Sequence, residues 1–324
     1  MSRSVLILGV LLAVLSAVSS SAGGRRSEVK DQATELHNPG LDSTESTELP
    51  ESPASPYAEL EPIELNAERL YGIAVCAEDR ILVSADRRIF VFGQAGESLG
   101  GFGLEEPAGC LAVGPEGLLY LGMSDHVQVY GPAGSRVATW AGLGNEALVT
   151  SIFATPEEVF VADAGNHMVL RFDRGGRLLD YIRGDGSAGP KLIIPSPYFD
   201  LLVTSEGTLL LTNPGRHRVH SYTTEGEYLG FWGRCAPEIE AFCGCCNPTH
   251  IALTPAGSIV TSEKGIPRIK VYDSRGVFQA LVAGPEDFAE GTTGLDLAVD
   301  SRGRVVVLDP KSRTVRIFAK ELPR

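Results

Sequence analysis

The sequence predicts an all-β fold, a six-bladed β-propeller built from four-stranded antiparallel blades, on three observations. One pattern of short apolar segments recurs six times along the 324 residues, at a spacing of roughly 40 to 50 residues. Turns such as "GPEG", "TPAG" and "DSRG", which are typical of tight hairpins, separate the segments. Helical periodicity of any length is absent. Four antiparallel strands per copy are what a propeller blade contains.

Each copy has the same order of parts. A first apolar strand leads to a second, such as "LLYLG", a polar turn leads to a third, such as "MVLRF", and a weaker fourth strand follows. The sixth copy stops at its third strand, close to Arg324, which would leave an unpaired edge. The segment "YAELEPIEL", residues 57–65, precedes the first copy and is expected to supply the missing strand. The ring, residues 57–324, is therefore expected to be closed by N- and C-terminal segments that share one blade.

The N-terminal part predicts export. Arg3 is followed by the apolar run "VLILGVLLAVLSAV" and then by small residues. We expect residues 1–22 to be a cleaved signal peptide, because the apolar run is shorter than the roughly 20 residues that a membrane span needs. An uncleaved membrane anchor is the alternative. Residues 23–56, rich in Ser, Thr, Glu and Pro, are expected to form a disordered acidic linker. The protein is accordingly expected outside the cytoplasm, secreted or periplasmic, and touching a membrane only through such an anchor.

The charge of the chain argues against nucleic acid as a partner. The formal net charge is -13, and much of it lies in the linker and the acidic segment after it. A basic face is not evident in the sequence. We expect a monomeric propeller without nucleic-acid binding.

One copy carries a specific family resemblance. "VFVADAGNHMVLRFDRGGRLL", residues 159–179, resembles the NHL repeat, and the likeness extends in weaker form over residues 57–324. The segment "GCCNPTHIALTPAGSIVTSEKGIPRIKVYDSRG" resembles a form found in uncharacterised bacterial NHL-type proteins, with GCCNP followed by EKG and RxKVY. The resemblance implies that Asp163, Asn166 and His167 bond the backbone of their own turn and brace neighbouring blades, with ligand contact as the alternative.

Two enlarged linkers predict which face of the ring carries function. Residues 184–197 follow the third blade and residues 233–248 follow the fourth, and the turns between second and third strands open on the same side. Polar loops on a rigid scaffold are the usual place for function. The predicted ligand-binding residues on this face are Tyr198, Asn213, Arg216, His217, Glu263, Lys264 and Arg268. A solvated ion-pair network is the simpler interpretation of this charged turn, and recognition of an anionic or sugar-like ligand is the alternative. The charged residues of the turn are Glu263, Lys264, Arg268 and Lys270.

Histidines offer a route to metal binding. His126, His167 and His217 occupy comparable turns of successive blades, and His250 opens the fifth blade. Imidazoles gathered at the centre of the ring could bind zinc or copper, although the turns lie at different radii. The fold itself requires no cofactor.

The cysteines divide into two groups. Cys76 and Cys110 fall in predicted innermost strands, where buried thiols are common. Export favours disulfides among the other four, with Cys245 and Cys246 each pairing with Cys235 or Cys243 rather than with each other. Metal binding by these thiols with His250, or a redox role, stays open.

Two classes of function are consistent with these features. The first is a non-catalytic scaffold whose loop face binds a protein, peptide or glycan. The second is a metal-dependent propeller enzyme, similar at the fold level to peptidylglycine amidating lyase or to lactonases. Such a lyase uses histidine-held zinc with an arginine and a tyrosine, for which His126, His167, His217, Arg268 and Tyr198 are candidates. A metal or electron-transfer protein using the cysteine loop is a third hypothesis. We expect binding rather than catalysis, because no contiguous catalytic motif is present.

Overall fold

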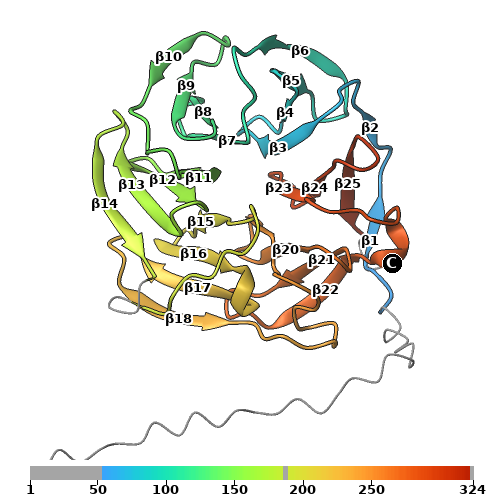
Figure 1. The fold of residues 1–324 in the computed structure, drawn as a ribbon. Coiled ribbons are helices and arrows are strands. Elements are labelled where there is room, and N and C mark those ends of the chain that lie inside the picture. The colour runs from blue at the N-terminus through green and yellow to red at the C-terminus, as the bar shows by residue number, and fades with distance from the viewer. Residues whose placement is uncertain (1–52, 185–188, 322–324) are drawn as a thin grey trace, which may run out of the picture. The chain divides into compact units, whose positions relative to one another are not determined.

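The computed structural model describes residues 53–184 and 189–321, and in these residues six antiparallel sheets surround a common axis (Figure 1). Five sheets contain four strands and the sixth contains five. Each sheet is one blade, and the first strands of all six blades line a cavity at the axis. The predicted six-bladed propeller is thereby confirmed.

The strands follow the repeat copies in order. Blade 1 consists of β3 (Leu70–Val75), β4 (Ile81–Ala85), β5 (Arg88–Phe92) and β6 (Ser98–Gly103). Blade 2 consists of β7 (Cys110–Val113), β8 (Leu119–Gly122), β9 (Val127–Tyr130) and β10 (Arg136–Thr139). Blade 3 consists of β11 (Val149–Ala154), β12 (Glu158–Asp163), β13 (Met168–Asp173) and β14 (Leu178–Arg183).

The second half of the ring has the same arrangement. Blade 4 consists of β15 (Leu201–Val203), β16 (Thr208–Asn213), β17 (Arg218–Thr223) and β18 (Tyr228–Trp232), with the short 3-10 helix η1 (Pro214–Arg216) between β16 and β17. Blade 5 consists of β19 (His250–Leu253), β20 (Ile259–Glu263), β21 (Arg268–Tyr272) and β22 (Phe278–Ala283), and η2 (Pro285–Asp287) follows it. Blade 6 consists of β23 (Asp296–Val299), β24 (Val305–Asp309) and β25 (Thr314–Lys320), completed by β1 (Tyr57–Glu59) and β2 (Ile63–Glu64).

The N-terminal segment closes the ring, as the truncated sixth copy predicts. Strand β1 pairs antiparallel with β25, with Tyr57 opposite Lys320, and β2 pairs with the other end of the same strand, with Ile63 opposite Val315. Arg316 forms a two-pronged ion pair with Glu59, both contacts being 2.6 Å. The edge that the C-terminal strand would otherwise expose is therefore covered.

The apolar core lies between successive blades. In one cluster, Ile73 and Val83 of blade 1 pack with Val306 and Ile317 of blade 6. Every residue of β24 is buried, whereas the outermost strand β6 is almost wholly exposed. Burial is thus greatest in the second strand, which the two adjacent blades cover, and is lower in the first strand at the axial cavity and lowest at the rim.

Glycine completes the predicted hairpin turns. In "TPAG", Gly257 has a φ of +79° and its N–H donates to the carbonyl of Thr254 at 2.9 Å. A residue with a Cβ would be strained at this φ. The turn residues read from the sequence therefore have a direct steric cause.

The N-terminal predictions fall largely outside the described residues. The expected signal peptide, residues 1–22, and residues 23–52 of the expected linker are not described. Within the linker's last residues, the Ser55 hydroxyl lies 2.9 Å from the carbonyl of Val282 in blade 5. In the part of the chain that is described, no helix has the length and the apolar character needed to cross a bilayer.

A substitution in the closing strand should weaken the ring. Ile63 is buried in the cluster that joins blades 6 and 1. Replacing it, Ile63→Ala, is expected to lower the free energy of unfolding in urea by about 2 to 5 kcal/mol, because the cavity removes contacts on both sides of the closure. The matched control is Leu60→Ala, an exposed residue of the same segment, for which a change below about 1 kcal/mol is expected. Equal effects of the two substitutions would contradict a closing role for this segment.

A buried histidine makes stability depend on pH. His220 of β17 is fully buried beside Tyr222 and Tyr228, and its Nδ1 has no hydrogen-bond partner. Burial, reinforced by the nearby Arg218, lowers the pKa of His220 to about 4. The unfolded imidazole, with a pKa near 6.5, binds a proton that the folded one rejects, so stability falls as pH drops from about 6.5 toward 4.

This titration should contribute about 3 kcal/mol of lost stability over that pH interval. Urea unfolding of the native protein and of His220→Leu, each at a series of pH values, measures the difference. The variant should lose less stability on acidification than the native protein. Parallel pH profiles would show that His220 does not stay neutral in the fold.

Candidate functional site

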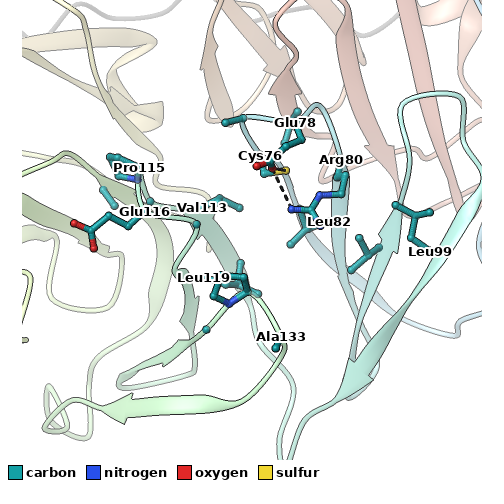
Figure 2. A pocket seen from close by; sticks show the side chains of 18 of the residues that line it. Cys76, Glu78, Arg80, Leu82, Leu99, Val113, Pro115, Glu116, Leu119 and Ala133 are labelled. Carbon is teal, nitrogen blue, oxygen red and sulfur yellow. Dashed lines mark hydrogen bonds and ion pairs between the residues drawn. The ribbon is translucent and has the colours of Figure 1, made fainter.

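A large groove lies on one face of the ring, and the polar groups at its end pair with one another. It has a volume of about 680 Å3 and lies between blades 1 and 2, beside the hairpins that join their first and second strands (Figure 2). At one end, the Sγ of Cys76 lies 3.0 Å from Glu78 Oε2, and Arg80 donates to the same oxygen at 3.1 Å. Cys76 is only half-buried and lies just beyond β3, so the expectation of a buried inner-strand thiol is correct for Cys110 and wrong for Cys76.

The axial cavity, by contrast, gathers one equivalent position from every blade. This cavity has a volume of about 360 Å3 and is lined by the first strands of all six blades. The equivalent positions lie at or near the start of each first strand, opposite the last part of the second strand. They are Gly72, Cys110, Ser151, Asp200, His250 and Asp296. Three of the six, on consecutive blades 4, 5 and 6, bring their ligand atoms close enough together to hold a metal ion.

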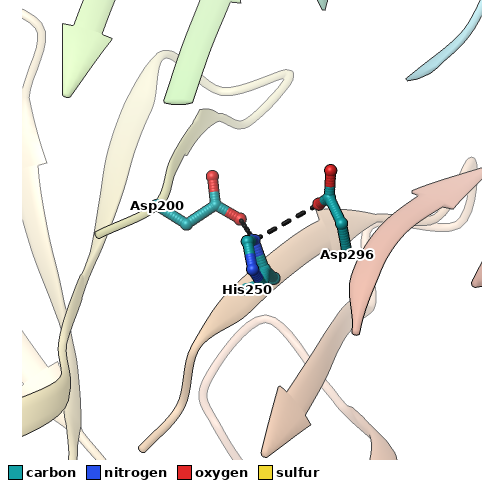
Figure 3. Close-up of side chains that lie close together, drawn as sticks. All are labelled: Asp200, His250 and Asp296. Carbon is teal, nitrogen blue, oxygen red and sulfur yellow. Dashed lines mark ion pairs between the residues drawn. The ribbon is translucent and has the colours of Figure 1, made fainter. Parts of the chain in front are cut away.

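Asp200, His250 and Asp296 form a compact cluster (Figure 3). The Nδ1 of His250 lies 3.2 Å from Asp296 Oδ1 and 3.6 Å from Asp200 Oδ2. One possible ligand atom from each residue lies within 4.8 Å of the other two. All three side chains are at least four-fifths covered, with exposures of 10% for Asp200, 13% for His250 and 16% for Asp296.

Both carboxylates also join neighbouring blades. Asp200 Oδ2 accepts the backbone N–H of Ile251 in blade 5 at 2.8 Å, and Asp296 Oδ2 accepts that of Ile73 in blade 1 at 2.9 Å. The other oxygen of each carboxylate accepts the N–H of the residue that follows it, at 2.8 Å. The aspartates therefore satisfy inner-strand donors that no sheet partner could reach, and they orient their remaining lone pairs toward His250.

Electrostatics couple the three side chains. Burial, with the Asp200 carboxylate nearby, raises the pKa of Asp296. Burial disfavours the charged form of His250, but the Asp296 and Asp200 carboxylates outweigh that effect and raise the pKa of His250. Burial, with the same two carboxylates, raises the pKa of the Cys110 thiol as well. The cluster is therefore a negative centre that attracts a proton or a cation.

An aromatic side chain and a lysine lie beside His250, at the end of the cavity where the first strands begin, which is called the mouth below. The ring of Tyr198, which ends the first enlarged linker, meets the His250 ring edge to face with centroids 5.6 Å apart. Lys264, in the turn after β20, has its Nζ 5.1 Å from the Tyr198 ring centroid and donates to Ser196 Oγ at 2.9 Å. Tyr198, Lys264 and His250, all singled out by sequence, are thus brought together, on the face that the linkers predicted.

Glu263 and Arg268 lie elsewhere, in a buried network that anchors the cysteine linker. Glu263 Oε2 receives Arg268 at 2.6 Å and the N–H of Cys243 at 3.0 Å, and its Oε1 lies 2.6 Å from Lys270 Nζ. Lys270 also donates to the carbonyl of Ala241 at 2.7 Å. Burial lowers the pKa of Lys270 to about 8, although Glu263 opposes this. The expectation of a solvated charged turn is wrong for Glu263, Arg268 and Lys270, because the linker folds over them and buries them.

The cysteine linker contains no disulfide. All six cysteines lie within the described residues and all are free thiols. The pairing of Cys245 or Cys246 with Cys235 or Cys243 is not formed. Instead, the Sγ atoms of adjacent Cys245 and Cys246 lie 2.9 Å apart. The linker is held by the buried network of Glu263 rather than by covalent bonds.

The remaining predicted residues brace loops. Asn213 accepts the N–H of Ile193 at 2.9 Å and donates to the carbonyl of Lys191 at 3.1 Å, and Arg216 donates to the same carbonyl at 3.0 Å. Both therefore hold the first enlarged linker. His217 bonds the second linker, with its Nε2 2.7 Å from the carbonyl oxygen of Gly244.

The NHL-like turn has the contacts of a structural turn. Asp163 Oδ1 accepts the backbone N–H groups of Leu148, Gly165 and Asn166, and its Oδ2 accepts the Asn166 amide at 2.7 Å. His167 is exposed in left-handed backbone, with a φ of +53°.

The predicted gathering of histidines at the centre does not occur. His126 bonds Asp125, with Nδ1 2.9 Å from its carboxylate, and His167 and His217 stay in their own turns. In the described part of the chain, only His250 of these four lines the axial cavity. Its partners Asp200 and Asp296 were not singled out from sequence. Aligning "YFDLLV", "PTHIAL" and "GLDLAV" would have placed Asp, His and Asp in one column.

Comparisons with known proteins show the fold alone. No model of a known protein family matches the chain, and no curated protein matches it in sequence. A streptogramin B lyase structure is 13% identical with a TM-score of 0.58, covering 82% of this chain and 98% of that one. A catalytically inactive variant of virginiamycin B lyase from Staphylococcus aureus, in complex with quinupristin, is 10% identical with a TM-score of 0.59, covering 81% and 99%. A protein of unknown function from Bacteroides thetaiotaomicron is 17% identical with a TM-score of 0.62, covering 80% and 72%.

The buried ion network makes Glu263 a sensitive position. Glu263→Gln would leave two buried cations without their counter-charge, so we expect a loss of about 3 to 5 kcal/mol in the free energy of unfolding, measured in urea. Glu240→Gln is the matched control, because Glu240 belongs to the same linker but pairs with Arg234 at the surface. Its effect should stay below about 1 kcal/mol. Comparable losses for the two variants would contradict this assignment.

Proposed function

We propose that this protein binds a divalent cation at the axis of the ring and, above it, a ligand that enters through the loop face. The observation that carries the proposal is the cluster of Asp200, His250 and Asp296, which places three ligand-type atoms within 4.8 Å of one another. These atoms come from three blades and meet only at the axis. The Asp–His–Asp cluster is therefore a product of the ring and not of a local turn.

The chemistry of the cluster suits a metal ion. Two carboxylates with a neutral imidazole carry two negative charges in a confined space, which a divalent cation would neutralise. Zinc ligands lie about 2.0 to 2.2 Å from the ion, so adjacent ligand atoms in such a site are about 3 to 3.5 Å apart. The observed separations of 3.2 and 3.6 Å are close to this range. A mixed imidazole and carboxylate set favours Zn2+ or Mn2+.

The mouth of the cavity suggests the chemistry of the ligand. Tyr198 and Lys264 are half-buried there and present an aromatic ring and an ammonium group. Only one of the three ammonium donors of Lys264 has a partner in the described residues, Ser196. This combination fits a small molecule that carries a ring and an anionic or hydrogen-bonding substituent.

An enzymatic role of this site is supported by analogy. Two of the propellers with a similar fold are named as lyases, one of them in complex with quinupristin. Fold similarity alone does not transfer an activity. The analogy nevertheless directs the search toward a metal-assisted lyase reaction on a ring-containing substrate. In such a reaction the metal would polarise a bound oxygen, and His250 and the two aspartates would hold the metal.

A second candidate is the non-catalytic scaffold that binds a protein, peptide or glycan through the loop face. It is favoured by the cross-bracing of the two enlarged linkers. Arg216 bonds the first linker and His217 the second, and Lys264 reaches back to Ser196 of the first. A rigid loop surface of this kind suits recognition. Export by the N-terminal segment would place this surface outside the cytoplasm.

Metal titration tests the principal proposal. Isothermal titration of chelator-treated protein with Zn2+ and with Mn2+ should show one site. His250→Gln should weaken it at least about tenfold, because a ligand is lost while both interblade hydrogen bonds of the aspartates remain. The matched control is His126→Gln, which removes a histidine beside carboxylates away from the axis.

Two further results decide the metal proposal. Asp296→Asn should also weaken binding, and a thermal scan of each metal-free variant shows whether it is folded. Absence of binding to the native protein, or loss of binding in His126→Gln but not in His250→Gln, would refute a metal site at the axis.

A further inference from the structure

The linker cysteines form a site that the axial cluster does not use. In the turn "CGCC", Gly244 and Cys246 both have positive φ, +76° and +66°. Left-handed backbone is uncommon for a residue with a side chain, and where it occurs it is often associated with function. The side chains of Cys245 and Cys246 converge in this turn, with their Sγ atoms 2.9 Å apart. Cys245 is exposed and Cys246 is buried, so reagents can reach the Cys245 thiol directly, and the Cys246 thiol is adjacent to it.

The next residue joins this cysteine pair to the mouth of the axial cavity. Asn247 donates from Nδ2 to the carbonyl of Lys264 at 3.0 Å, and its Oδ1 accepts the Lys264 N–H at 2.8 Å. The Lys264 ammonium in turn contacts Ser196 and the Tyr198 ring. A change in the backbone at Cys246 therefore acts on the turn that carries Lys264 through a single side chain.

We propose that Cys245 and Cys246 are a reversible thiol modification site, which a small-molecule disulfide oxidises to a bond between the two adjacent cysteines, stiffening the mouth of the axial cavity. In the first step the Cys245 thiolate attacks one sulfur of the disulfide, forming a mixed disulfide and releasing the first thiol. In the second step the Cys246 thiolate attacks the Cys245 sulfur and releases the second thiol. The two protons lost by the cysteines are taken up by the two thiols released, and the two electrons reduce the added disulfide.

The other linker cysteines are poorer partners. Among the described residues, no hydrogen bond joins Cys235 or Cys243 to the sulfur atoms of the pair. Cys235 is exposed, and its backbone forms an isolated β-bridge with Phe242. Closing the Cys245–Cys246 ring would remove freedom from the peptide that precedes Asn247. The double hydrogen bond of Asn247 to Lys264 would then open less often.

The test uses the full chain, reduced, freed of reductant and treated with oxidised glutathione in the presence of a chelator. Alkylation, digestion and mass spectrometry locate any disulfide, and hydrogen exchange is followed in residues 194–199 and 262–268. We expect the bond between Cys245 and Cys246, and exchange in both segments slowed at least about threefold. Reduction should restore both signals. Because neither readout involves a metal, the outcome is independent of the proposed axial site.

Single substitutions separate this proposal from general oxidation. Cys245→Ser, at an exposed position, should abolish the disulfide and the slowed exchange, whereas Cys235→Ser, also exposed, should retain both. A disulfide that joins other cysteines, or glutathione that stays attached to Cys245, would overturn the assignment of the pair. A Cys245–Cys246 bond without any change in residues 262–268 would overturn its coupling to the mouth.

Discussion

The convergence of six inner strands on one axis is the constraint on which the rest of this structure depends. Neighbouring blades do not share a hydrogen-bonded sheet, so backbone N–H groups near the axis need acceptors from side chains. Asp200 and Asp296 meet that need, by accepting N–H groups from blade 5 and from blade 1. At the rim, pairing of β1 with β25 completes the same ring. Closure at the rim keeps the blades together, and the axial carboxylates set how their inner strands meet.

The atoms that join the blades are also the atoms that could bind a metal. Each carboxylate oxygen of Asp200 and Asp296 accepts one backbone N–H and retains a further lone pair. His250 lies where those lone pairs converge, so the cluster attracts either a proton or a cation. Structural and chemical roles are therefore not alternatives here. The fold holds the ligand atoms in place before any ion arrives, which is the arrangement that favours binding.

The volume of a cavity does not identify the candidate site in this protein. The groove between blades 1 and 2 is larger than the axial cavity, yet its polar groups at Cys76, Glu78 and Arg80 pair with one another. The axial cavity instead contains Asp200, His250 and Asp296, whose carboxylate oxygens keep lone pairs free for a further partner. The buried network of Glu263 holds the second enlarged linker against blade 5, and Asn213 and Arg216 hold the first. Rigid support of this kind lets the loops present Tyr198 and Lys264 in one arrangement.

The sequence by itself determined the six blades, their strand order, the closing segment and the face that carries the enlarged loops. Hairpin turns and strand patterns are local properties, and the side on which a linker emerges follows from strand order alone. Only the tertiary structure decided that His250 meets Asp200 and Asp296, because these residues belong to three blades and become neighbours when the ring closes. The sequence did not predict the burial of Glu263 and Arg268 either, because that burial arises when a linker folds back over the neighbouring blade. The contact between Cys245 and Cys246 occurs where Cys246 has a left-handed backbone. That conformation could not be predicted from the residue types, because cysteine does not favour it.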